Sequence, residues 1–265
     1  MNRILFLVLF INFAFSQKFE VDFNFYINRN NDLVSTIRKF ELVQNDKESI
    51  FKIINTHDIS QFKYKDLASI VSDKDSIVFF MVGENAVESI FNEVVYKDFF
   101  NNYQINNIHN GLNLELVNIK DSLFNLMQWE IIDAEVVNIA NYNCKKAKTF
   151  FRGREYWAYY TNEIANQGGP WKFDGLPGFI LKVESTDGFL LIEPTKIVFK
   201  KETPKISNPF LNKKVITFNQ IKDKILEQDK KYVSKMRSRP NPPDIIKIGK
   251  AISIEDYGLG ERIYE

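Results

Sequence analysis

The middle of the sequence holds a dense group of charged side chains, in which two arginines, Arg152 and Arg154, flank a glycine. Two guanidinium groups can bind a carboxylate or a phosphate through paired hydrogen bonds. They can also pair with acidic residues of the same chain and fix a turn, and we favour this second interpretation. We predict that at least one arginine reaches a carboxylate of this chain, and Glu163 and Asp174 are the favoured partners. The other, if it has no such partner, would face a groove beside Trp171.

A short aromatic segment follows, between two chain-breaking sequences. Trp171 and Phe173 point to the same side if the segment is extended, with Lys172 on the opposite side. A site for a ligand or a partner would use these three residues together with Arg152 and Arg154. The alternative, which we favour, is a folding device in which the segment turns the chain and plugs one end of a sheet.

The second chain-breaking sequence, Leu176-Pro177-Gly178, runs into Phe179 with the composition of a type II turn. Pro177 fixes φ at the second position of such a turn, and we predict a positive φ for Gly178 at the third. Pro177 also removes one of the backbone N–H groups that a phosphate-binding loop needs. No GxGxxG pattern begins at Gly175, so nucleotide binding is not indicated.

Composition limits the chemistry further. The 265-residue chain has a formal net charge of +1, one Cys and two His. The balanced charge argues against nucleic acid as a partner, and the Cys and His counts argue against a disulfide framework or a zinc site built from these residues alone. His57 and His109 have no companion at metal-site or triad spacing, so we expect no metal and no cofactor. Cys144 stands in an alternating stretch, and we expect it to be a buried apolar residue.

The elements that position these residues are expected to be mostly strands. Apolar and polar residues alternate over 19–27, as in a half-buried strand. Residues 144–160 are typical of two strands joined at Arg152-Gly153-Arg154. Residues 178–192 are typical of a hairpin, because the Asp187-Gly188 pair suits a tight turn. Further strands are expected at 33–43, 49–55, 76–82, from 94 onward, 112–119 and 123–137.

The expected fold class is mainly β, or β-dominated α+β: a large curved antiparallel sheet or partly open barrel with a C-terminal amphipathic helix at about 219–237. An early Arg, an apolar run and small residues before Gln17 are typical of a secretory signal peptide. We expect this signal peptide over 1–16, a β-rich domain over 17–218, and the helix with a loosely held tail over 219–265. No later segment is apolar for the roughly 20 residues that a membrane-spanning helix needs.

The segment 141–183 resembles the GLPGLI family of exported proteins from Bacteroidetes-type bacteria. The pattern joins a Cys-x-x-Ala strand, an Arg-Gly-Arg turn, a Tyr-Thr-x-Glu-Ile strand end and a Gly-Pro-x-Lys-Phe-x-Gly-Leu-Pro-Gly-Leu-Ile-Leu stretch. Its structural positions here are Cys144, Gly153, Gly169, Pro170, Gly175, Leu176, Pro177 and Gly178. This chain departs from the pattern at Tyr159, Ala165 and Phe179. The resemblance implies an exported β-rich protein, and it implies no established activity.

Three functional hypotheses remain open at this stage. The leading one is an exported binding or accessory protein of the periplasm, cell envelope or extracellular space, whose ligand is a peptide, a lipid or a protein. The second is a structural or assembly factor of the envelope without a small ligand. The third is a hydrolase that uses carboxylates near the motif, because paired carboxylates can act as acid and base. We lean towards a protein that is not an enzyme.

Overall fold

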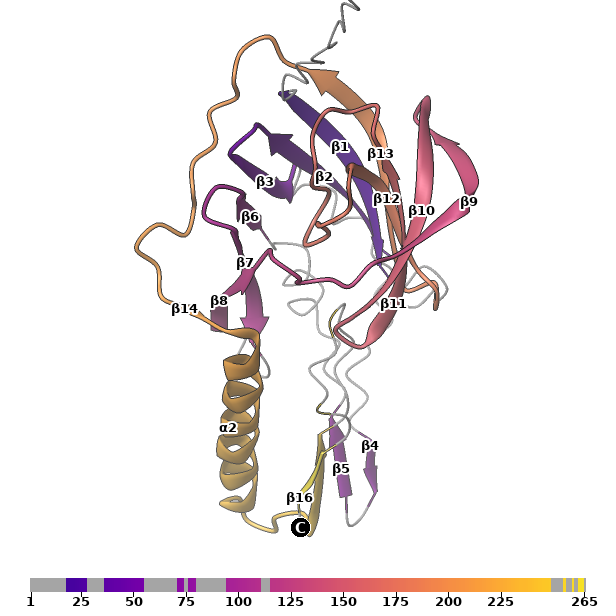
Figure 1. The fold of residues 1–265 in the computed structure, drawn as a ribbon. Coiled ribbons are helices and arrows are strands. Elements are labelled where there is room, and N and C mark those ends of the chain that lie inside the picture. The colour runs from indigo at the N-terminus through magenta and orange to yellow at the C-terminus, as the bar shows by residue number, and fades with distance from the viewer. Residues whose placement is uncertain are drawn as a thin grey trace, which may run out of the picture.

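The computed structural model describes residues 18–27, 36–54, 71–73, 76–79, 94–110, 115–248, 255, 259 and 262–264. The predicted signal peptide lies outside these residues, as do His57 and parts of the strands expected at 33–43 and 76–82. The described chain forms two sheets and one helix (Figure 1). The prediction of a β-dominated fold with one helix near the C-terminus is confirmed.

A curved sheet of 12 strands makes up the body of the protein, in the spatial order β14-β8-β7-β6-β3-β2-β1-β13-β12-β11-β10-β9 (Figure 1). Neighbouring strands in it are antiparallel, except that β14 pairs in parallel with β8. The strands are β1 (Phe19–Ile27), β2 (Thr36–Gln44), β3 (Glu48–Ile53), β6 (Val95–Asp98), β7 (Tyr103–Asn110), β8 (Glu115–Ser122), β9 (Glu130–Ile139), β10 (Tyr142–Phe151), β11 (Arg154–Thr161), β12 (Phe179–Ser185), β13 (Leu190–Phe199) and β14 (Val215–Ile216).

Strand β1 lies near the middle of this sheet, between β2 and β13. Its apolar side chains Phe19, Val21, Phe23 and Phe25 are at most 2% exposed, while the polar residues between them are partly exposed. The alternation that predicted a half-buried strand is therefore confirmed. The buried side chains belong to the main hydrophobic core, which also contains Phe173 of the motif segment.

Two tight connections agree with the sequence pattern. Strands β10 and β11 are joined by Arg152 and Gly153, whose φ angles are 44° and 85°. Positive φ at both central residues defines a type I′ turn, which suits the twist of a two-residue hairpin. Strands β12 and β13 form the other predicted hairpin, in which Gly188 has φ 71° and its N–H donates to the carbonyl of Ser185.

The strand predicted over 123–137 begins later than expected. Residues 123–126 form a turn instead, in which Leu126 N donates to Leu123 O and Asn125 has φ 55°. Asn is tolerated at positive φ, and this local preference of Asn125 explains why residues 123–126 turn instead of continuing as a strand. The strand predicted from 94 onward is two strands, β6 and β7, separated by a turn in which Asn102 has φ 57°.

The helix α2 (Phe218–Arg237) matches the predicted range closely. Thr217 caps its start, since its side chain accepts from Gln220 N while the Gln220 side chain accepts from Thr217 N. One face of the helix is buried through Ile221, Ile225 and other apolar residues. Within the described residues, no helix combines the length and apolar character needed to cross a membrane.

A second sheet of four strands lies beside the helix, in the order β16-β15-β5-β4 (Figure 1). Its strands are β4 (Val71–Asp73), β5 (Ser76–Phe79), β15 (Ile245–Ile248) and β16 (Arg262–Tyr264). Two of these strands belong to the C-terminal tail, which we expected to be loosely held. The described part of the tail is instead integrated, because Ile246 and Ile248 are buried against the helix residues Val233 and Met236.

Candidate functional site

The aromatic segment of the motif is buried inside the protein. Trp171 is 1% exposed, and Lys172 and Phe173 are 0% exposed. Phe173 N donates to Pro170 O at 3.1 Å, which closes a turn in which Trp171 has φ 50°. A bulky residue in the left-handed region is strained, so the surrounding structure must hold this turn in place. Phe173 packs edge-on against Tyr156, with ring centroids 5.0 Å apart.

A row of buried polar side chains crosses the sheet next to this segment. The strand registers place each member directly opposite the next, across β2, β3, β6, β7 and β8. Residues that are directly opposite in an antiparallel sheet point to the same face. This polar row consists of Gln44, Ser49, Lys97, Gln104 and Asp121.

Lys97 holds the motif segment from the middle of the polar row. Its Nζ donates to Gly169 O at 3.0 Å and to Phe173 O at 2.6 Å, and it pairs with Asp174 Oδ2 at 3.0 Å. Burial lowers the pKa of Lys97 below its ordinary value, although the carboxylate of Asp174 opposes that shift. Gln44 binds the same segment, since its Nε2 donates to Gln167 O at 2.6 Å.

A buried ionic cluster forms at the Asp121 end of the polar row. The Arg152 guanidinium reaches Asp121 Oδ1 at 2.7 Å and Glu255 Oε1 at 2.5 Å, and Lys172 Nζ lies 2.6 Å from Glu255 Oε2. Arg152 also lies over the ring of Phe218, the first residue of α2, at 3.7 Å. Burial by itself raises the pKa of Glu255, but Lys172 and Arg152 outweigh it and hold that pKa below its ordinary value.

The carboxylates that we favoured as partners of Arg152 and Arg154 were the wrong ones. Each arginine reaches a carboxylate, but neither pairs with Glu163 or Asp174. Arg154, at the start of β11, pairs at 2.7 Å with Asp187, which lies in the β12–β13 turn. Asp174 pairs with Lys97, and Glu163 Oε1 accepts from Asn143 N at 3.0 Å.

The prediction of a type II turn at Leu176–Phe179 was also wrong. Gly178 lies outside the left-handed region, and the glycine with positive φ in this stretch is Gly175, at 89°. Gly178 is needed for a different reason, because a Cβ atom there would lie 2.4 Å from Thr161 O. The composition correctly predicted a chain break. However, close backbone packing, and not a positive φ, is what requires glycine at position 178.

Cys144 is fully buried, as predicted. Burial, together with the nearby carboxylate of Glu163, raises the pKa of its thiol to about 12. Such a thiol stays protonated at neutral pH and is a poor nucleophile. Among the described residues, no three His, Cys, Asp or Glu side chains are grouped as metal ligands.

The motif residues are thus brought together, but inside the protein. Trp171, Lys172 and Phe173 are buried, while Arg152 lies in the ionic cluster. A binding role for these residues and for Arg154 stays a prediction. Sequence reasoning missed Lys97, Asp121 and Glu255, because nothing in their own segments marks them as partners of the motif.

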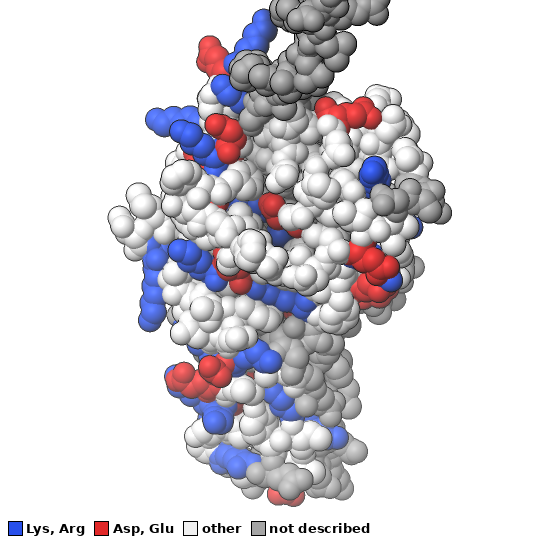
Figure 2. Space-filling view, viewed as in Figure 1, with Lys and Arg blue, Asp and Glu red and all other residues white. Residues whose placement is uncertain are grey.

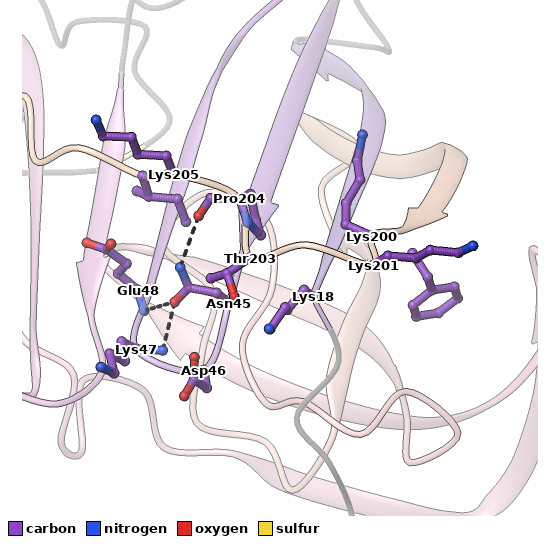
Figure 3. Close-up of a pocket in the computed structure, with 12 residues that line it drawn as sticks. Lys18, Asn45, Asp46, Lys47, Glu48, Lys200, Lys201, Thr203, Pro204 and Lys205 are labelled. Carbon is purple, nitrogen blue, oxygen red and sulfur yellow. Dashed lines mark hydrogen bonds between the residues drawn. The ribbon is translucent and has the colours of Figure 1, made fainter.

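An open groove lies on the surface, beside the start of β1 and the end of β13 (Figure 3). It has a volume of about 940 Å³. Five lysines and two carboxylates line it, and one of the lysines, Lys200, is paired with Glu20 at 2.6 Å, which leaves an excess of two positive charges. We call it the lysine groove, and its lining residues are Lys18, Asn45, Asp46, Lys47, Glu48, Phe199, Lys200, Lys201, Thr203, Pro204, Lys205 and Ile206.

Asn45 connects the two walls of the lysine groove (Figure 3). Its Oδ1 accepts from the backbone N–H groups of Lys47 and Glu48, at 2.9 and 3.0 Å. Its Nδ2 donates to Pro204 O at 3.4 Å, in the segment that follows β13. Asn45 is 5% exposed, so its hydrogen bonds are protected from solvent. They hold together the backbone segments that carry the groove lysines.

No family model and no curated protein matches the chain. Among solved structures, PNGF-II in two crystal forms gives TM-scores of 0.47 and 0.48, at 17% and 18% identity, over 80% of this chain and 33% of that one. A putative outer membrane lipoprotein-sorting protein domain from Vibrio parahaemolyticus gives a TM-score of 0.30 at 4% identity, over 74% of this chain and 90% of that one. The chain spans about a third of the PNGF-II chain. At these scores the similarity supports no functional assignment.

Proposed function

We propose that the chain is an exported binding or accessory protein of the GLPGLI family, and that the lysine groove binds an acidic peptide segment of a partner in the cell envelope. The observation that carries this proposal is the groove itself, which is concave, open and lined by an excess of lysines over carboxylates. Its volume of about 940 Å³ lies within the range of roughly 300–1,000 Å³ typical of ligand sites.

The arrangement of the charges favours an extended acidic ligand. The lysines come from the start of β1, the β2–β3 turn and the segment after β13, so they line both walls of the groove (Figure 3). Lysine ammonium groups act as compact point charges on flexible stems. They can therefore follow carboxylates spaced along a peptide without the fixed geometry that an arginine pair demands.

The other two hypotheses receive less support. A carboxylate hydrolase needs an acid and a base that can exchange protons, yet Asp121 and Glu255 are both engaged by the Arg152 guanidinium. A purely structural role explains the buried motif segment, but it does not explain why lysines outnumber carboxylates in the lysine groove. Export and binding together fit the predicted signal peptide and the described surface.

Reversing two groove charges is expected to weaken binding of an acidic peptide about tenfold, or about 1.4 kcal/mol. The variant is Lys201→Glu with Lys205→Glu, because both side chains are exposed in the groove. Binding of a fluorescent poly-glutamate peptide is measured by anisotropy at low and high salt. Binding should weaken because two attractive interactions with the peptide become repulsive. Salt screens these interactions, so the difference between the variant and the wild type should be smaller at high salt.

The matched control for this measurement is Lys230→Glu with Lys235→Glu, which changes two exposed lysines of α2. It produces the same change in net charge far along the chain from the groove. Equal weakening in the groove variant and the control would overturn the groove as the binding site. Unchanged binding in both would also place the peptide outside the groove, and a wild-type protein that does not bind the peptide would overturn the proposal of an acidic ligand.

Export is expected to leave a mature protein that begins at Gln17. The apolar run before this residue ends in small residues at the positions that a signal peptidase recognises. Intact mass spectrometry of protein from the envelope or the culture medium measures the N-terminus. Recovery of the chain only from the cytoplasm, with Met1 retained, would contradict the export part of the proposal.

A further inference from the structure

Three surface turns meet around Tyr103, the first residue of β7. The β6–β7 turn and the turn after β8 are joined by a hydrogen bond from Leu123 N to Asn102 O at 3.1 Å. The segment after β13 joins them, because its residue Phe210 belongs to the same hydrophobic cluster as Tyr103. The three turns therefore occupy one patch of surface, although they lie far apart in the sequence.

Each of these turns presents one large apolar side chain to solvent. Phe100 is 87% exposed, Phe124 is 71% exposed and Leu211 is 72% exposed. The neighbouring Phe210 is only 5% exposed and packs on Tyr96. The segment that carries Leu211 is thus anchored, and its exposed side chain is held at the surface. We call Phe100, Phe124 and Leu211 the apolar tips.

The surface next to the apolar tips is basic. Lys120 Nζ lies 4.1 Å from the Tyr103 ring, and Lys213 Nζ lies 5.8 Å from the Phe210 ring. On the side of the body where Figure 1 places β6–β8 and the segment after β13, Figure 2 shows several Lys or Arg side chains, fewer Asp or Glu side chains and uncharged side chains between them.

The nearby carboxylates offset only part of this charge. Asp98 contributes one negative charge and also binds the N–H and the side-chain amide of Asn101, both at 2.8 Å. Asp121 is buried in the ionic cluster with Arg152. The lysine groove adjoins the same patch, since Phe99 N donates to Lys47 O at 2.8 Å.

We propose that the apolar tips attach the protein peripherally to an anionic lipid surface. Separate protruding side chains on three turns do not form the flat, dry patch that a protein interface needs, but each can enter the boundary between headgroups and acyl chains. The flanking lysines would contact lipid phosphates, as basic residues beside apolar anchors do. The contact buries few side chains, so it is reversible. This attachment is independent of peptide binding in the lysine groove.

The test is flotation of the purified protein with vesicles of phosphatidylcholine alone or mixed with phosphatidylglycerol. The wild-type chain is expected to float with the mixed vesicles and to do so less with phosphatidylcholine alone. The variant carrying Phe100→Ser, Phe124→Ser and Leu211→Ser is expected to lose at least tenfold of its vesicle-bound fraction. The three positions are exposed, so circular dichroism and melting should match the wild type.

The matched control is Phe150→Ser, because Phe150 is also 71% exposed but lies on β10, away from the three turns. It should bind vesicles like the wild type. Equal binding by the triple variant, or equal loss in the control, would overturn the proposal. Loss of self-association in the triple variant with unchanged vesicle binding would show a protein interface instead. Acidic-peptide binding should persist in the triple variant, which separates this test from that of the groove.

Discussion

Glu255→Ala is expected to lower the free energy of unfolding by about 3–5 kcal/mol, the usual cost of removing one member of a buried ion pair. Glu255 is 3% exposed and holds both Arg152 and Lys172. Its loss would remove the carboxylate that lies 2.6 Å from the ammonium group of Lys172, which is 0% exposed. Urea unfolding at pH 7, followed by tryptophan fluorescence, measures the change.

The pH dependence of this effect has a defined sign. The pKa of Glu255 in the folded protein is below its ordinary value of 4.5, so its carboxylate stabilises the fold fully above about pH 4.5. This contribution is lost as the pH falls through the folded-state pKa. The difference in stability between the wild type and Glu255→Ala should therefore shrink in acid. A difference that grows in acid would contradict the ionised state of Glu255.

Glu227→Ala provides the comparison, because Glu227 also pairs with a lysine but lies on the exposed face of α2. Exposed pairs contribute little, so its urea midpoint should stay close to that of the wild type. If Glu255→Ala unfolds at the same urea concentration as this control, the buried ionic cluster does not stabilise the fold.

Local features of the fold were predictable from the sequence. The alternation in β1, the helix from Phe218 to Arg237 and the hairpins at Arg152-Gly153 and Asp187-Gly188 each depend on residues close together in the chain. Strand period, helix period and turn chemistry act over a few residues, so a single sequence contains them. The resemblance to the GLPGLI pattern stays a prediction.

The site was less predictable because its contacts are long-range. Arg152 and Glu255 are 103 residues apart in the chain, and Lys97 and Asp174 are 77 residues apart. A lysine in a strand normally indicates the solvent face, yet Lys97 is 1% exposed. Only the sheet register brings it under the motif segment. Carboxylates nearer in the sequence, such as Glu163, were therefore the wrong candidates for Arg152.

Gly178→Ala is expected to lower the free energy of unfolding by about 3 kcal/mol, at the upper end of the range for inserting one carbon into a packed site. The new Cβ would lie 2.4 Å from Thr161 O and 2.5 Å from Asn162 Oδ1. The amide of Asn162 can turn away, but Thr161 O belongs to β11, which pairs with β12 at this point. The start of β12 must therefore shift, and the strand pairing that holds the motif would weaken.

Gly175→Ala separates this steric cause from a backbone cause. Gly175 has φ 89°, but a Cβ there would meet only Trp129 atoms at 3.7 and 3.8 Å, which is ordinary contact. Its cost should be that of placing alanine at positive φ, about 1 kcal/mol. Urea unfolding should therefore rank Gly178→Ala as more damaging than Gly175→Ala. The reverse order would show that positive φ, rather than the approach of β11 to Gly178, is what the Gly-Leu-Pro-Gly segment requires of its glycines.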